Sequence, residues 1–114
     1  KISERLAEAA VADAFKDYRV IIQPQRLEKT PKGGTRPDMR IARDDADERL
    51  FSIEVKDGDA RQKTSQRERQ ALLGKTHIMR VYRAENRMTI DGIPAQEWFA
   101  AMRRKLDQLG LRKE

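Results

Sequence analysis

Three residues on two neighbouring segments combine the side-chain types and spacing that metal-assisted hydrolysis needs. In the segment LFSIEVK, residues 50–56, apolar residues alternate with Ser52, Glu54 and Lys56. Alternate side chains of a strand point to opposite faces, so a strand here would hold a carboxylate and an ammonium side by side on one face. Pro37-Asp38 begins the preceding strand candidate and brings a second carboxylate to where it can face Glu54.

Two carboxylates and a backbone carbonyl are hard oxygen ligands, which suit Mg²⁺ or Mn²⁺. A metal held there orients a phosphate, lowers the pKa of a bound water and stabilises charge on the leaving oxygen. Lys56 beside that water is suited to align it or to help deprotonate it. Each part of phosphodiester hydrolysis therefore has a candidate among Asp38, Glu54 and Lys56.

Each element of this pattern also has an ordinary explanation. A Glu-x-Lys pair on a strand usually forms a salt bridge, and Pro-Asp is a frequent turn dipeptide. The combination is more specific than its parts, because an apolar strand surrounds Glu54 and Lys56 and another strand candidate begins at Asp38.

Pro37-Asp38 followed by Ile53-Glu54-Val55-Lys56 resembles the Pro-Asp…(Asp/Glu)-x-Lys signature of the PD-(D/E)XK, or restriction-endonuclease-like, nucleases. Gln66, ten residues after Lys56, resembles the glutamine of VRR-NUC-type domains and of several bacterial toxin nucleases. The turn after Lys56, rich in Gly and Asp, agrees with that pattern. The 16-residue gap between Asp38 and Glu54 is long for compact members, and the acidic turn at 44–48 accounts for it as an insertion.

The resemblance implies roles for these residues and for an acid on the first helix. Asp38 and Glu54 would bind the metal, Lys56 would act on the water, and Gln66 would orient substrate or water. The acid is Glu4 or Glu8; we favour Glu4, because its helical angle lies within the packed face. The resemblance extends from residue 1 to about 83, and we interpret residues 84–114 as a C-terminal helical extension.

The positive charge of the chain is concentrated in one stretch. The net charge is +6, and residues 61–83 carry seven basic side chains and one acidic side chain, which equals the whole excess. Concentrated positive charge favours a polyanion such as nucleic acid, although it also occurs on ordinary solvated faces. The residues expected to contact phosphate are Arg61, Lys63, Arg67 and Arg69.

The bulk composition restricts the class of protein. A chain of 114 residues is one domain, and its 38% hydrophobic residues fall in periodic clusters that indicate a folded core. It has no cysteine, so disulfides and thiolate metal sites are excluded, and no apolar run is long enough for a membrane span. The chain begins with lysine, which is expected of a domain cut from a longer protein.

Periodicity predicts an α/β fold. We expect a helix over 3–18 capped by Ser3, a loop over 24–37, a helix from Ser65 to about Leu73, and a last helix from Pro94 to Gly110. Strands are expected at 20–22, 39–43, 50–56 and 77–82, with a further short candidate at 87–90. The sequence thus predicts a single domain, 1–114, with a four-stranded mixed sheet covered by helices on both faces, as in the restriction-endonuclease-like core.

The expected function is a divalent-metal-dependent nuclease, with DNA as the favoured substrate. Within this class the alternative is a toxin domain that cleaves tRNA or DNA and is neutralised by an immunity protein. A non-catalytic nucleic-acid-binding module is the alternative from another class. We expect the protein in the cytoplasm, or in a target cell's cytoplasm if it is a toxin. His77 is expected to be structural, and Trp98 and Phe99 are expected in the core.

Overall fold

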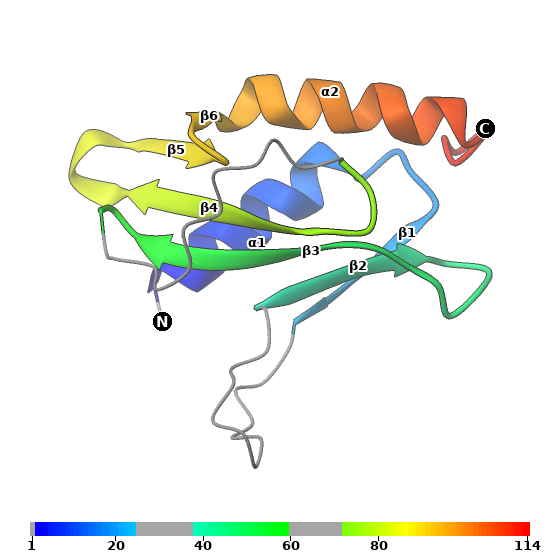
Figure 1. The fold of residues 1–114 in the computed structure, drawn as a ribbon, viewed down its shortest axis with the longest axis horizontal. Helices are drawn as coiled ribbons and strands as arrows, with labels where there is room; N and C mark the ends of the chain where they lie inside the picture. The colour runs from blue at the N-terminus through cyan, green and yellow to red at the C-terminus, as the bar shows by residue number, and fades with distance from the viewer. Residues whose placement is uncertain (1, 25–37, 60–71) are drawn as a thin grey trace, which may run out of the picture.

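The computed structural model describes residues 2–24, 38–59 and 72–114. The described residues form two helices, six strands and a short 3₁₀ turn, arranged as Figure 1 shows. In chain order these are α1 (Ile2–Ala14), β1 (Val20–Pro24), β2 (Met39–Arg43), β3 (Arg49–Asp57), β4 (Thr76–Tyr82), η1 (Arg83–Glu85), β5 (Arg87–Ile90), β6 (Ile93–Pro94) and α2 (Ala95–Gln108). No helix in these ranges is long and apolar enough to cross a membrane.

The strands form one six-stranded sheet in the order β1-β2-β3-β4-β5-β6. Within the described part of the chain, β3 and β4 are the one parallel pair, and the other neighbouring strands pair antiparallel. The α/β class and the mixed sheet agree with the sequence prediction, but the prediction of four strands was wrong.

Of the two further strands, β5 matches the short strand candidate at 87–90, and β6 follows from turn chemistry that the sequence analysis did not weigh. Asp91 and Gly92 both have positive φ, at 51° and 84°, and connect Ile90 to its cross-strand partner Ile93. Asp-Gly between apolar residues is the typical sequence of a two-residue hairpin. Asn86, also left-handed with φ 51°, precedes the strand that begins at Arg87. Residues 84–114 therefore supply two strands of the sheet as well as a helix.

Both helices pack on the same face of the sheet. The ring of Phe51 on β3 lies 5.9 Å from that of Phe15, just after α1, and 5.6 Å from that of Trp98 on α2. Phe99 contacts Phe15 as well, with centroids 5.6 Å apart, and all four rings are almost completely buried, as predicted for Trp98 and Phe99. The expectation of helices on both faces is not met by the described residues.

The helix boundaries differ from the predicted ones at several points. α1 ends at Ala14 rather than near Tyr18, and Ser3 lies inside the helix instead of capping it. α2 follows Pro94 and stops before Gly110, close to the prediction. The predicted helix from Ser65 and most of the predicted loop at 24–37 lie outside the described residues.

His77 is completely buried and connects two parts of the fold. Its Nδ1 lies 2.5 Å from a carboxylate oxygen of Asp91, and its Nε2 lies 2.8 Å from the carbonyl oxygen of Leu72. The other Asp91 oxygen accepts the backbone N–H of Ile78 at 2.9 Å. These bonds fasten the β5–β6 turn to the start of β4, which is a structural role.

Candidate active site

Strand β3 places Glu54 and Lys56 on the face of the sheet opposite the two helices. Phe51 and Ile53 are fully buried on the helix side, and alternation turns Glu54 and Lys56 to the other side. Both side chains remain partly accessible, 21% exposed for Glu54 and 28% for Lys56. An apolar strand thus fixes the backbone while leaving two charged groups within reach of solvent.

Asp38 joins this pair from the residue that precedes β2. Met39 lies opposite Ile53 in the antiparallel ladder, so Asp38 comes next to Glu54. Its Oδ2 accepts the backbone N–H of Val55 at 2.6 Å. The carboxylate is therefore fixed between the two residues that the sequence singled out on β3.

Burial raises the pKa of Asp38 above its ordinary value of 3.8, and the nearby negative charges of Glu4 and Glu54 raise it further. The Val55 N–H and the positive charge of Lys56 act in the opposite direction and are outweighed. Three carboxylates and one ammonium thus interact at one place. Such a convergence of acids is costly without a cation and becomes favourable with one.

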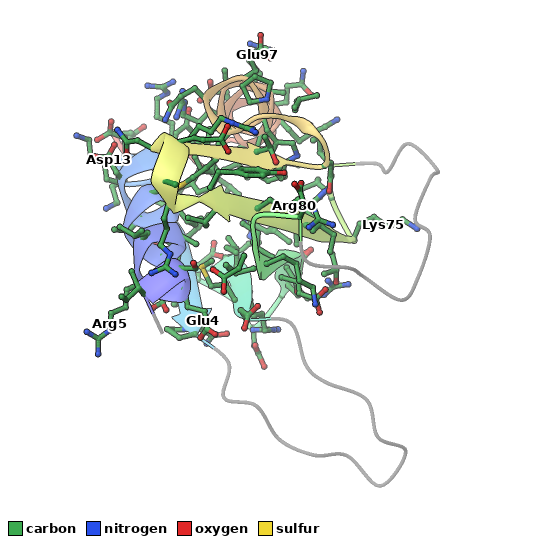
Figure 2. The ribbon with its side chains drawn as sticks, turned by 90° about the vertical axis from the view of Figure 1, so that its left-hand side faces the viewer. Glu4, Arg5, Asp13, Lys75, Arg80 and Glu97 are labelled. Atoms are coloured by element: carbon green, nitrogen blue, oxygen red, sulfur yellow. The ribbon has the colours of Figure 1, made fainter. Side chains whose placement is uncertain are left out.

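The first turn of α1 brings Glu4 to this cluster. Ser3 is buried and its hydroxyl donates a hydrogen bond to the carboxylate of Asp57, the last residue of β3. This contact attaches the start of α1 to the carboxyl end of β3, which lie close together in Figure 1. Glu4 then turns toward the sheet while Arg5 extends away from the protein (Figure 2). The first-helix acid that acts on Asp38 is Glu4.

Glu54 and Lys56 attract each other without a close hydrogen bond between them. Lys56 Nζ lies 3.8 Å from Glu54 Oε2, beyond hydrogen-bond distance. The arrangement leaves the ammonium able to donate to a water or a phosphate.

Arg80 is a further basic residue on the site face, and the sequence analysis counted it only as part of the basic stretch. It pairs with Lys56 in the parallel ladder between β3 and β4. Its Nη1 donates to the carbonyl oxygen of Gly58 at 2.8 Å, in the turn that follows β3. Alternation along β4, with His77 and Met79 buried on the helix side, is the signal from which the sequence analysis could have predicted the face that carries Arg80.

The donor set suits Mg²⁺ or Mn²⁺ in chemistry, although no group of three or more His, Cys, Asp or Glu among the described residues is spaced as a metal site. Mg²⁺ usually keeps several waters and takes one or two protein carboxylates. Asp38 and Glu54 provide such a pair. Burial, and to a smaller extent repulsion from Glu4 and Glu54, raises the pKa of Asp38, and a bound cation would offset that repulsion. By the chemistry of their side chains, Asp38 and Glu54 would be the two carboxylates to hold a hydrated divalent ion, and the charge of Glu4 acts on Asp38.

The remaining residues predicted for the site lie in 60–71, outside the described residues: Gln66, Arg61, Lys63, Arg67 and Arg69. Their roles stay predictions. A cavity of about 530 Å³ lies elsewhere, between α1, α2 and the β4–β5 connection, and is lined in part by Leu6, Val81, Arg87 and Phe99. Asp38, Glu54 and Lys56 do not line it.

No protein-family model matches the chain, and no curated protein or solved structure is significantly similar to it. The functional argument therefore depends on the geometry of the site and on the resemblance of its motif.

Proposed function

We propose that the protein is a divalent-metal-dependent nuclease that hydrolyses phosphodiester bonds, with DNA as the favoured substrate. The supporting observation is the convergence of Asp38, Glu54, Glu4 and Lys56, from three elements, at one place on the sheet. Residues far apart in the chain carry the charges that this hydrolysis needs. The positive net charge of +6 agrees with a polyanionic substrate.

In this proposal Asp38 and Glu54 hold Mg²⁺ or Mn²⁺, which supplies charge stabilisation and a more acidic water when bound. The Val55 N–H keeps the Asp38 carboxylate in a fixed orientation. Lys56, on the same face as Glu54, aligns the attacking water and offsets the charge that grows on the phosphate oxygens. Glu4 adds a further negative charge that acts on Asp38 and that a bound cation would offset.

The function is tested by incubating the protein with supercoiled plasmid, linear duplex, single-stranded DNA, total RNA and tRNA. Each substrate is given Mg²⁺, Mn²⁺ or a chelator. Cleavage of at least one substrate with metal, and none with chelator, is expected. Tight binding of nucleic acid without cleavage under every condition would instead identify a non-catalytic binding module. Cleavage of tRNA alone would direct attention to the toxin class.

A further inference from the structure

The cavity between the two helices and the β4–β5 connection is lined by apolar and by basic side chains. Leu6 of α1, Met88 of β5 and Phe99 of α2 supply apolar surface, and Arg83 and Arg87 line the cavity as well. Among the described residues, no acidic side chain lines it. Its volume, about 530 Å³, lies within the range of about 300–1,000 Å³ that is typical of ligand sites. The cavity therefore suits a flat, largely apolar group that is attached to an anion.

Arg87 is held against the ring of Tyr82 at the wall of this cavity. The two are register partners on β5 and β4, and the guanidinium carbon lies over the ring, 3.8 Å from its centroid. Arg87 Nε donates to a carboxylate oxygen of Glu85 at 3.3 Å, and the Tyr82 hydroxyl donates to Asp59 at 3.0 Å. The Arg87 side chain is nevertheless 49% exposed. A planar guanidinium can stack between two rings, of which Tyr82 supplies one.

A second hollow connects this cavity with the end of the strand that carries the candidate active site. It is more open, has a volume of about 430 Å³, and shares Tyr82 and Arg83 with the cavity. It is also lined by Asp57 and Gly58, which directly follow Lys56. In Figure 1 the β4–β5 connection lies at the same end of the sheet as the carboxyl ends of β3 and β4. A nucleic-acid strand that passes Lys56 therefore has a path along the second hollow to the cavity.

We propose that this cavity binds an unpaired nucleobase of the substrate strand, stacked on Arg87, close to the phosphate that is cleaved. This proposal deepens the proposed nuclease function and rests on its substrate being nucleic acid. Base stacking on aromatic and guanidinium groups tolerates any sequence, because every base has a π-face. Arg83 contributes positive charge for the phosphate next to that base. A base can enter the cavity only when it is not paired, so the preferred substrate is single-stranded DNA, or a frayed or mismatched duplex.

The test measures binding by fluorescence anisotropy with chelator, so that it does not depend on cleavage. Three probes of equal length are compared: single-stranded DNA, a perfectly paired duplex, and an abasic strand that keeps the phosphates without the bases. The variants are Arg87→Ala, Arg87→Lys and Ala10→Leu, which adds bulk at a residue that lines the cavity. Arg104→Ala is the matched control, because Arg104 is an exposed arginine of α2 that does not line the cavity. Thermal unfolding of each variant reports any loss of fold.

We expect wild type to bind the single strand more tightly than either other probe. Arg87→Ala should weaken binding of the single strand by about 10-fold, within the range for loss of one base-stacking side chain, and binding of the abasic strand by much less. Arg87→Lys, which keeps the charge without the planar group, should recover only part of the loss. Ala10→Leu should weaken binding of the single strand selectively, and Arg104→Ala should match wild type.

Two results would overturn the base site. One is an Arg87→Ala variant that binds the single strand as wild type does, and the other is an equal loss on the single strand and the abasic strand, because Arg87 would then contribute charge alone. A wild type that binds all three probes equally would overturn it as well. The nuclease function fails separately: a protein that shows the expected binding and cleaves nothing with Mg²⁺ or Mn²⁺ would have the base site without the catalytic activity.

Discussion

Asp38 is the residue on which the arrangement of the site depends most. It stands just before β2, yet its carboxylate is bonded to the backbone of β3 and interacts with charges on α1 and β3. The sequence placed it near Glu54 from the strand order alone. The hydrogen bond from the Val55 N–H to Asp38 could not be predicted, because it depends on the register of β2 and β3, which the sequence pattern does not specify.

The raised pKa of Asp38 predicts how stability depends on pH. Folding favours the protonated form, so ionised Asp38 opposes folding at pH 7, and this cost disappears as pH falls through its folded pKa. Asp38→Asn keeps an oxygen to accept the Val55 N–H and removes the charge. With chelator at pH 7, we expect urea unfolding to show a higher free energy of unfolding for Asp38→Asn than for wild type. The difference should close toward pH 3.8, the ordinary value.

Asp45 provides a control of the opposite sign. Its hydrogen bond with Arg43 lowers its pKa, so ionised Asp45 favours folding at neutral pH, and that contribution is lost as pH falls through its folded pKa. Asp45→Asn should therefore lower stability slightly at pH 7.

Mg²⁺ should raise the melting temperature of wild type more than that of Asp38→Asn. An Asp38→Asn variant less stable than wild type with chelator at pH 7 would contradict the charge convergence.

Substitutions at Lys56 distinguish a catalytic role of this residue from a purely structural salt bridge with Glu54. If it acts on the attacking water, Lys56→Ala should reduce the single-turnover rate by about 100-fold or more and leave DNA affinity nearly unchanged. Lys56→Arg, which keeps the charge and changes the geometry, should also be slow. If Lys56 served only in a partly exposed salt bridge with Glu54, its loss would cost about 1 kcal/mol of stability and leave the cleavage rate unchanged. Lys16→Ala, at an exposed lysine after α1, is the control.

At the scale of elements, the strands that carry the site were predicted well and the rest less well. β2 matches its predicted bounds, and β3 exceeds them by one residue at each end, because strict apolar alternation is a strong local signal. β5 matches the short strand candidate at 87–90, whereas β6 was not predicted and follows the left-handed turn at Asp91 and Gly92. From its local sequence, Ser3 is predicted to be an N-cap. Its buried position within α1 is explained by the hydrogen bond to Asp57, a tertiary contact that local sequence does not specify.

The sequence did not decide which acid of α1 belongs to the site, Glu4 or Glu8. The hydrogen bond from Ser3 to Asp57 attaches the first turn of α1 to β3, and the charge of Glu4 acts on Asp38. We therefore predict that Glu4, and not Glu8, serves the metal. Glu4→Gln should raise the Mg²⁺ concentration for half-maximal cleavage by about 10-fold, within the range for residues that support a metal site. Glu8→Gln should remain close to wild type in a Mg²⁺ titration of the cleavage rate. Equal effects of the two variants, or a larger effect of Glu8→Gln, would remove Glu4 from the site.

At the scale of the whole molecule, composition indicated a small folded domain, and the charge distribution indicated a polyanionic partner. The sheet face opposite α1 and α2 carries Glu54, Lys56 and Arg80. Alternation alone placed the first two there. The parallel pairing that brings Arg80 beside Lys56 is a long-range feature, and the sequence pattern of β4 does not reveal which strand it joins.

The basic stretch predicts a strong salt dependence of nucleic-acid binding. Replacing Arg61, Lys63, Arg67 and Arg69 together by Ala should flatten the slope of log affinity against log salt, by about one unit for each phosphate that the protein no longer neutralises. Fluorescence anisotropy with chelator measures the slope without cleavage. Alanine at four cations elsewhere, Arg5, Lys16, Arg104 and Lys113, is the matched control. An equal change of slope in both variants would show that net charge matters and the location of the stretch does not.

The central claim is that Glu54 belongs to a metal-dependent phosphodiesterase centre, and the most direct test is the single-turnover cleavage rate of Glu54→Gln in Mg²⁺. Glu97→Gln serves as the control, since Glu97 is an exposed acid in the first turn of α2, and Figure 2 shows it at the opposite end of the molecule from Glu4. We predict that Glu54→Gln, folded and able to bind nucleic acid, loses at least about 1000-fold in rate, a barrier increase of about 4 kcal/mol, while Glu97→Gln equals wild type. A folded Glu54→Gln that cleaves at the wild-type rate would contradict the account.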